Sequence, residues 1–292
     1  MSMTTILDGK KTSATIRAEV AAEVAELTAQ QGRAPGLTVI LVGEDPGSQV
    51  YVRNKERACA EAGIVSVAHR LPASTTQAEL EALVDALNAD DSVDGILLQL
   101  PLPQGLDSQK LLDRIDPDKD VDGFHPVSVG RLALGLPGFR SCTPAGVIEL
   151  LDRHGIDPSG KRAVIVGRSN IVGKPLALLL MQGWKGGNAT VTVCHTRTPD
   201  LKKECLDADI LVAAVGRPRM ISGDMVREGA VVVDVGINRT EEGLCGDVDF
   251  ESAKEKAAAI TPVPGGVGPM TIAMLLKNTL RAYKLHQGLE AW

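Results

Sequence analysis

Residues 164–175 have the sequence VIVGRSNIVGKP, which predicts a strand, a tight turn and the start of a helix. A glycine such as Gly167 lets the backbone turn sharply where the strand ends. Pro175 suits the first turn of a helix, whose free N-terminal amides can bind phosphate. The pattern therefore predicts a phosphate-binding turn. Its candidate residues are Gly167, Arg168, Ser169 and Gly173.

The glycine spacing of this turn differs from the G-x-G-x-x-G fingerprint of dinucleotide-binding folds, so an ordinary structural turn is the alternative. The next expected strand ends in CHTR at residues 194–197, where an NAD-binding fold usually has an acidic residue. Thr196 and Arg197, together with Arg168, can instead bind a 2'-phosphate, because a guanidinium matches phosphate oxygens in charge and geometry. We therefore expect NADP as the cofactor, the alternative being that Arg197 only solvates a strand end.

Two further turns are expected at the same edge of the sheet, because ligands of open α/β sheets bind at the carboxyl ends of strands. They are VGRP at residues 215–218 and DVGIN at residues 234–238. Gly216 and Ile237 are therefore candidates to line the cofactor. Ordinary tight turns would have the same sequences.

The whole chain alternates β-like runs with helical segments, which predicts an α/β fold with mostly parallel sheets. The expected strands of the first half are 37–43, 64–71 and 93–99, with helices starting near Ser48 and Thr75 and a third at 107–114. Those of the second half are 162–167, 189–195, 209–216, 230–236 and 258–261. The second set is almost continuous Val, Ile and Ala, which is typical of strands buried on both faces.

The length of 292 residues, 44% of them hydrophobic, favours two domains. Residues 124–144 are rich in Gly and Pro and lack periodicity, so we predict the interdomain connection there, with a cleft beside it. Residues 1–143 would form an N-terminal α/β catalytic domain, completed by a C-terminal helix within 271–292. Residues 144–270 would form a Rossmann-like dinucleotide-binding domain.

Composition argues against several classes of function. A net charge of -6 gives no electrostatic footprint for nucleic acid, and no apolar run approaches the ~20 residues that cross a bilayer. Residues 1–11 carry Asp8, Lys10 and Lys11 where a secretory peptide has its apolar core, which predicts a cytoplasmic protein. Five scattered cysteines and five scattered histidines show no zinc-type spacing, so we expect no metal.

A second set of polar side chains lies in the first half. Tyr51 and Lys55 are one turn apart on the expected helix, for which Ser48 is the expected N-cap. The run GILLQLPLP at residues 95–103 predicts a buried strand stopped by prolines, with Gln99 at its carboxyl end, where α/β sheets bind ligands. A surface tyrosine–lysine pair and a glutamine bonded to nearby backbone are the alternatives.

Two loops complete the set. The sequence DKDVDG at residues 118–123 is similar to the opening of a calcium loop, but the twelfth position is Val129 rather than Glu. Asp122 is instead a candidate to bind an amine-rich heterocycle, with a solvated acidic loop as the alternative. The sequence TPVPGGVGPMT at residues 261–271 specifies a fixed backbone path near a ligand or another segment. Thr271 would cap the last helix, expected at 271–286.

Taken together, these sequences closely resemble the methylenetetrahydrofolate dehydrogenase/cyclohydrolase family over essentially the whole chain. Chance agreement of five patterns in order is negligible, although each alone is weak. The patterns are Tyr51-x-x-x-Lys55, Asn88 leading to Ile96–Pro101, Asp120–Phe124, Gly167–Ser169 and Pro264–Pro269.

The resemblance implies a homodimer with an N-terminal folate-binding domain and a C-terminal NADP-binding domain. Tyr51 would stack on the folate, Lys55 and Gln99 would act at the one-carbon centre, and Asp122 would anchor the pterin ring. Family members often have Ser and Lys where this chain has Thr196 and Arg197, so the hydroxyl and the positive charge are preserved. Further implied site residues are Pro264, Gly265 and Gly266 for the folate and Arg168, Thr196 and Thr271 for the cofactor.

The resemblance also implies two successive reactions. NADP would oxidise 5,10-methylenetetrahydrofolate to 5,10-methenyltetrahydrofolate, and water would convert that product to 10-formyltetrahydrofolate. Lys55 is the candidate proton shuttle, with Gln99 orienting its amine. Three alternatives remain at this stage: another two-domain NADP dehydrogenase of the shikimate type, a monofunctional cyclohydrolase, and a regulatory module that binds a nucleotide without chemistry.

Overall fold

The computed structural model describes residues 4–292 and divides into two compact units. Among the described residues, unit 1 comprises 4–14 and 143–271, and unit 2 comprises 15–142 and 272–292. The expected domain limits need correction at the N-terminus, because strand β1 (Thr5–Ile6) pairs in parallel with β11 (Ala259–Ile260) of unit 1. Residues 1–3 of the N-terminal stretch discussed above lie outside the described residues.

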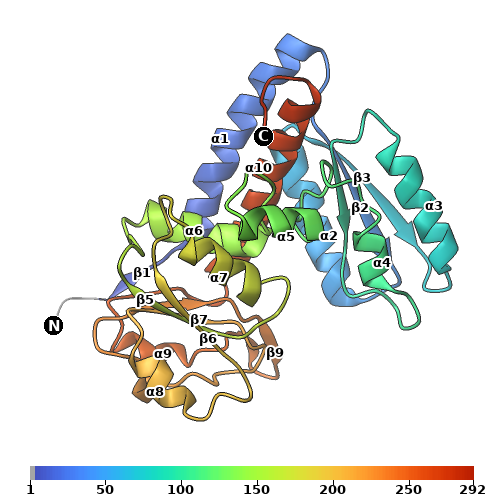
Figure 1. Cartoon of the computed structure of the whole chain (residues 1–292). Helices are drawn as coiled ribbons and strands as arrows, with labels where there is room; N and C mark the ends of the chain where they lie inside the picture. Colours follow the sequence, from blue (N-terminus) through green and yellow to red (C-terminus); the bar gives the residue numbers. More distant parts are fainter. Residues whose placement is uncertain (1–3) are drawn as a thin grey trace. The chain divides into compact units, whose positions relative to one another are not determined.

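Unit 2 contains a three-stranded parallel sheet in the order β3-β2-β4 (Figure 1). Its strands are β2 (Gly36–Val42), β3 (Val65–Leu71) and β4 (Gly95–Leu98), each within two residues of the predicted limits. The central strand β2 is buried along its whole length, whereas the edge strand β3 leaves Val65 and Val67 exposed. All three predicted strands of the first half are therefore confirmed.

Helices cover both faces of this sheet, with α2 on one side and α3 and α4 on the other (Figure 1). They are α2 (Pro46–Glu61), α3 (Gln77–Asn88) and α4 (Ser108–Leu112). The side chains of α3 and α4 pack on alternate residues of the strands, as a period of two requires. This core includes Ile40, Val42, Leu80, Val84, Leu87, Ile96, Leu98, Leu111 and Leu112.

The helices differ from prediction in four places. Asp45, rather than Ser48, caps α2, since its carboxylate accepts a hydrogen bond from the Ser48 amide at 2.7 Å. The boundary between the units, after residue 142, lies within the predicted connection 124–144, but this stretch is not aperiodic, because α5 (Pro126–Ala133) forms there with the His125 ring as its cap. The last helix, α10 (Val267–His286), begins before Thr271, which is therefore inside the helix. Helix α1 (Gly9–Gln31) was not predicted at all.

Unit 1 contains a six-stranded sheet in the order β1-β11-β8-β7-β5-β6, with all neighbours parallel. The central strands are β5 (Arg162–Val166), β7 (Ile210–Ala213) and β8 (Val231–Asp234). The prediction that the strands are buried on both faces is confirmed for these three. It is wrong for β6 (Thr190–Cys194), an edge strand that is only partly buried. Strand β6 follows β5 on one side, and β7 follows on the other side of β5. Sheets of this type bind ligands in the crevice at such a reversal of strand order.

Shorter elements surround the sheet of unit 1. The helices are α6 (Cys142–Arg153), α7 (Gly173–Met181), α8 (Leu201–Leu206), α9 (Phe250–Lys254) and the 3-10 helix η1 (Gly223–Met225). Strands β9 (Asn238–Thr240) and β10 (Gly243–Cys245) form an antiparallel hairpin after β8. Among residues 4–292, no helix is both long and apolar enough to cross a membrane.

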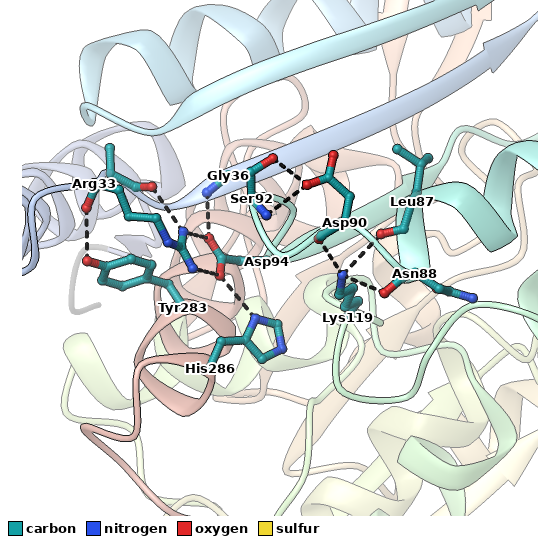
Figure 2. A network of polar contacts seen from close by, with 11 residues as sticks. Arg33, Gly36, Leu87, Asn88, Asp90, Ser92, Asp94, Lys119, Tyr283 and His286 are labelled. Atoms are coloured by element: carbon teal, nitrogen blue, oxygen red, sulfur yellow. Dashed lines mark hydrogen bonds and ion pairs between the residues drawn. The ribbon is translucent and has the colours of Figure 1, made fainter.

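A buried ion pair fastens the end of α10 to the sheet of unit 2 (Figure 2). Asp94, with no exposed surface, accepts two hydrogen bonds from the Arg33 guanidinium at 2.7 and 2.8 Å and one from the Gly36 amide at 2.7 Å. From α10, His286 Nδ1 lies 3.0 Å from Asp94, and the Tyr283 hydroxyl donates to the Arg33 carbonyl. Burial raises the pKa of Asp94, but these partners more than offset it, so its pKa is lowered overall.

A second buried charge lies nearby. The Lys119 ammonium donates to the carbonyls of Leu87, Asn88 and Asp90 at 2.8 to 3.0 Å (Figure 2). These carbonyls lie at the end of α3, where a cation interacts favourably with the helix dipole. Desolvation nevertheless lowers the pKa of Lys119. Lys119 thus fixes the entry of the loop that contains Asp120 and Asp122.

Replacing Asp94 by Ala is expected to lower the free energy of unfolding by about 3 kcal/mol, because the Arg33 guanidinium and the Gly36 amide lose their acceptor. Urea unfolding followed by circular dichroism measures the change. The control is Asp224→Ala, because Asp224 is exposed and its ion pair with Lys202 lies on the surface, where such pairs contribute little. Equal unfolding midpoints for the two variants would contradict the role of Asp94.

Candidate active site

Lys55 and Gln99, which the sequence predicts to act together, are in direct contact. Lys55 Nζ donates a hydrogen bond to Gln99 Oε1 at 3.1 Å, and Gln99 Nε2 donates to the Leu100 carbonyl at 2.8 Å. The second bond fixes the amide, so that its oxygen faces the amine. Lys55 is only 8% exposed, which is unusual for an ammonium group and indicates a specialised environment.

Tyr51 lies on the same helix, α2, one turn before Lys55. It is 42% exposed, and partial burial of its ring raises the pKa of the phenol. Helix α2 therefore presents an accessible aromatic face next to a buried amine. An exposed ring of this kind can stack on a flat heterocycle without moving other side chains.

Asp122 belongs to the same group of side chains. Burial raises the pKa of Asp122, while the positive charge of Lys55 and a hydrogen bond with the Cys142 thiol lower it. The thiol itself is inert, since burial and the Asp122 charge raise the pKa of Cys142 well above its usual value. Unit 2 thus holds the Lys55 amine against the Gln99 amide, with the Asp122 carboxylate near enough for the Lys55 charge to lower its pKa.

Asp120 holds the loop of Asp122 in place, a role that the sequence analysis missed. The Asp120 carboxylate is 2% exposed and accepts hydrogen bonds from the amides of Gly123, Phe124 and His125 and from the Ser128 hydroxyl at 2.8 to 3.1 Å. An aspartate three residues before a glycine is a known turn signal and could have indicated this role.

Asn278, from α10, fixes the other side of this loop. Its Nδ2 donates to the Val121 carbonyl at 2.8 Å and to the Arg140 carbonyl at 3.0 Å. Gly123 is tightly enclosed there, because a Cβ atom on it would lie 2.5 Å from the Arg140 carbonyl carbon. No local sequence pattern reveals Asn278, because 157 residues separate it from Val121.

In unit 1, the predicted tight turn is present after β5. Gly167 has φ +128°, and a Cβ atom there would lie 2.1 Å from the Ala214 carbonyl oxygen. A Cβ atom at Gly173 would lie 2.3 Å from the Gly167 carbonyl oxygen. Only glycine therefore fits at these two positions, which explains their spacing without the G-x-G-x-x-G fingerprint.

The amides at the start of α7 have hydrogen-bond partners in the turn before the helix. Ser169 Oγ accepts hydrogen bonds from the Val172 and Gly173 amides at 3.1 and 3.4 Å, and the Ser169 carbonyl accepts one from Lys174. These amides have partners within the protein, and their predicted binding of phosphate stays a prediction. Ser169 instead shapes the turn that carries Arg168.

Arg168, Thr196 and Arg197 lie at neighbouring strand ends. Val166 of β5 pairs with Cys194 of β6, and the Gly167 amide donates to the Cys194 carbonyl at 2.9 Å, so the two turns are adjacent. All three side chains are exposed, and His195 stands where an NAD-binding fold usually has an acid. Two guanidinium groups and a hydroxyl at this edge fit a 2'-phosphate.

The remaining predicted residues also lie in unit 1. Gly216 has φ +65° and is exposed after β7, and Ile237 is 45% exposed after β8. Pro264, Gly265 and Gly266 form the turn before α10, where the Gly265 carbonyl accepts a hydrogen bond from the Lys10 amide at 2.9 Å. Thr271 Oγ1 lies 2.9 Å from Thr143 Oγ1.

Two family models match this chain. The catalytic domain of tetrahydrofolate dehydrogenase/cyclohydrolase matches residues 7–122, and the NAD(P)-binding domain of the same enzyme matches residues 141–287. The chain belongs to the tetrahydrofolate dehydrogenase/cyclohydrolase family. Each family model includes residues of both units, because residues 7–14 belong to unit 1 and residues 272–287 to unit 2.

Relatives in the tetrahydrofolate dehydrogenase/cyclohydrolase family cover nearly the full length. The bifunctional protein FolD of Desulfovibrio desulfuricans is 68% identical, over 96% of this chain and 98% of the relative. The crystal structure of the bifunctional enzyme FolD from Campylobacter jejuni is 51% identical, with a TM-score of 0.93 over 97% of this chain and 99% of that one. The Trypanosoma brucei enzyme, complexed with NADP cofactor and inhibitor, is 40% identical, with a TM-score of 0.92 over the full length of both chains.

Asp120 is expected to make stability depend on pH. Burial raises its pKa from 3.8 to about 6, although the hydrogen bonds from His125, Ser128 and Phe124 lower it. The folded protein then binds this proton more tightly than the unfolded chain does, so the contribution of Asp120 is fully present below the unfolded pKa and is lost as pH rises through the folded one.

Urea unfolding of the wild type and of Asp120→Asn at several pH values tests this expectation. As pH rises from 3.8 to about 6, the free energy of unfolding of the wild type should fall relative to that of Asp120→Asn, because only the wild type loses the proton of Asp120. The other carboxylates titrate in both proteins, so their effect cancels when the free energy of unfolding of the variant is subtracted from that of the wild type. A difference that moves toward the wild type over this range would show that the pKa of Asp120 is not raised.

Proposed function

We propose that this chain is a bifunctional enzyme that oxidises 5,10-methylenetetrahydrofolate to 5,10-methenyltetrahydrofolate with NADP and hydrolyses the product to 10-formyltetrahydrofolate. The observation that carries the proposal is the hydrogen bond from the buried Lys55 ammonium to Gln99. The accessible ring of Tyr51, one helical turn from Lys55, and the Asp122 carboxylate, whose pKa the Lys55 charge lowers, support the same proposal. The names of the FolD relatives support both activities.

Unit 2 would bind the folate. Tyr51 would stack on its ring system through the exposed aromatic face. The Asp122 carboxylate would accept paired hydrogen bonds from the N–H groups of the pterin, an arrangement that is strong because the acceptor is charged. Pro264, Gly265 and Gly266 of unit 1 remain a prediction as further folate-binding residues.

Unit 1 would bind NADP, which supplies the hydride acceptor. Arg168, Thr196 and Arg197 would hold the 2'-phosphate, because guanidinium groups form bidentate hydrogen bonds with phosphate oxygens. Gly167 and Gly173 would allow close approach of the ligand to the turn after β5. Other proposed cofactor-binding residues are Ser169, Gly216, Ile237 and Thr271. A homodimer is also proposed, on the family resemblance alone, together with a cytoplasmic location.

Lys55 would act in the second reaction. Water attacks the methenyl carbon, and its oxygen loses one proton to give the neutral adduct. As the bond from the carbon to the ring nitrogen then breaks, the oxygen loses its second proton and the nitrogen gains one, so that one proton is released overall. An uncharged Lys55 amine can accept the first oxygen proton and, as ammonium, donate it to the leaving nitrogen, while the second oxygen proton passes to solvent; Gln99 Oε1 holds the amine in position. Alignment of the carbon with the acceptor ring, rather than acid–base chemistry, would promote the preceding hydride transfer.

The alternative functions do not account for this cluster. A shikimate-type dehydrogenase would share the strand-end crevice of unit 1 but has no need for Tyr51, Lys55, Gln99 and Asp122 together. A nucleotide-sensing module would need no buried amine at all. A monofunctional cyclohydrolase would leave the cationic edge formed by Arg168 and Arg197 without a ligand.

Replacing Lys55 by Met is expected to reduce methenyltetrahydrofolate hydrolysis by at least 100-fold, because the proton shuttle is lost. Loss of methenyl absorbance measures the rate. Arg57→Met is the matched control, since Arg57 lies on the same helix with its side chain 70% exposed, and it should hydrolyse the substrate at the wild-type rate. Near-normal hydrolysis by Lys55→Met would reject the assignment.

Replacing Arg168 by Ala is expected to raise the KM for NADP about tenfold or more, with little change in the KM for NAD, because only NADP carries the 2'-phosphate. Initial rates of methylenetetrahydrofolate oxidation with each cofactor provide the comparison. Arg227→Ala is the control, since Arg227 pairs with Asp209 at the amino ends of the strands. Equal effects on both cofactors would refute 2'-phosphate recognition by Arg168.

A further inference from the structure

The Asp247 carboxylate, which has no exposed surface, is the meeting point of three loops in unit 1. Its Oδ2 accepts hydrogen bonds from the amides of Val215 and Gly216 at 2.6 and 2.9 Å. Its Oδ1 accepts from the Arg217 amide at 2.8 Å and from Asn238 Nδ2 at 2.9 Å. Four N–H groups thus use the four lone-pair sites of the carboxylate.

A second buried carboxylate supports the first. Asp234, at the end of β8, accepts hydrogen bonds from the amides of Gly236, Asp247 and Val248 at 2.9 to 3.0 Å. The packing leaves no room for other side chains, because a Cβ atom on Gly236 would lie 2.3 Å from Asp247 Oδ1. The two turns after β7 and β8 are therefore held in one relative position by Asp247, with Asp234 holding Asp247.

These turns are the ones that carry Gly216 and Ile237, yet Asp247 itself is completely covered and cannot touch a ligand. We infer that Asp247, with Asn238, is a positioning residue that sets the affinity of unit 1 for the part of the dinucleotide bound beyond β7 and β8. This inference rests on the proposed NADP dependence and deepens it. It adds residues that the predicted cofactor site did not include.

The strand order says which half of the dinucleotide should respond. β5 and β6 carry Arg168, Thr196 and Arg197, so the 2'-phosphate half belongs to that side of the switch point. The other half then extends over β7 and β8, where the loops fixed by Asp247 lie. Loss of Asp247 should therefore weaken binding of whole NADP and spare a ligand that contains only the 2'-phosphate half.

Asp247→Asn provides the test, because it preserves volume but replaces one acceptor oxygen by a donor that must face an N–H group. We expect the Kd for NADP to rise about tenfold or more, since a buried hydrogen bond to a charged group is lost and a donor is left unpaired. The Kd for 2',5'-ADP and the rate of methenyltetrahydrofolate hydrolysis without NADP should stay within about twofold of the wild type.

Two further variants make the result specific. Asp249→Asn removes the same charge two residues away. Among the described hydrogen bonds, the Asp249 carboxylate accepts only one from the Ser252 hydroxyl, so this variant should bind NADP as the wild type does. Asn238→Ala removes one of the four donors and should raise the Kd for NADP in the same direction but less. It keeps the inference testable if Asp247→Asn does not fold.

The possible outcomes separate this inference from the proposed function. An unchanged Kd for NADP in both Asp247→Asn and Asn238→Ala overturns the positioning role. Equal losses of affinity for NADP and 2',5'-ADP also overturn it, because they indicate general damage to unit 1. If the wild type itself neither binds nor reduces NADP, the proposed function fails, and the inference fails with it.

Discussion

Buried aspartates that accept several N–H groups hold the loops on which both proposed ligands depend. Asp120 does so for the loop of Asp122 in unit 2, and Asp247 does so for the turns of Gly216 and Ile237 in unit 1. A carboxylate removed from water is tolerated only when hydrogen bonds replace its hydration. Each loop is therefore confined to the conformation that directs its N–H groups at that carboxylate, and an exposed loop gains the rigidity that a binding site requires.

The reactive groups lie on more regular elements. Lys55 projects from α2, which Asp45 caps, and Gln99 follows the buried strand β4. Helix α10 contributes to this arrangement from a distance in the sequence, because Asn278 holds the loop of Asp122 and His286 contacts Asp94. The proposed chemistry of unit 2 thus depends on packing contacts that involve no ligand. Mutations at Asn278 or Asp94 would then affect activity through the position of Asp122 or through stability.

Sequence reasoning succeeded where a local pattern has one structural solution. The buried strands, the Gly167 turn and the Lys55–Gln99 pair were predicted, because hydrophobic runs, glycines and strand ends constrain the backbone locally. It was wrong about Ser48, because the neighbouring Asp45 side chain caps α2, and about the start of α10, which begins at Val267 rather than Thr271. Asn278 and Asp247 could not be found, since their partners are far away in the sequence and only the folded chain brings them together.

A coupled absorbance assay of the wild-type protein with 5,10-methylenetetrahydrofolate tests the central claim most directly. With NADP present, the account predicts formation of NADPH together with transient methenyltetrahydrofolate, which then decays as 10-formyltetrahydrofolate accumulates. With NAD in place of NADP, the same reaction should be slower, because no 2'-phosphate engages Arg168. Absence of NADPH formation, or methenyltetrahydrofolate that accumulates without enzyme-dependent decay, would contradict the account.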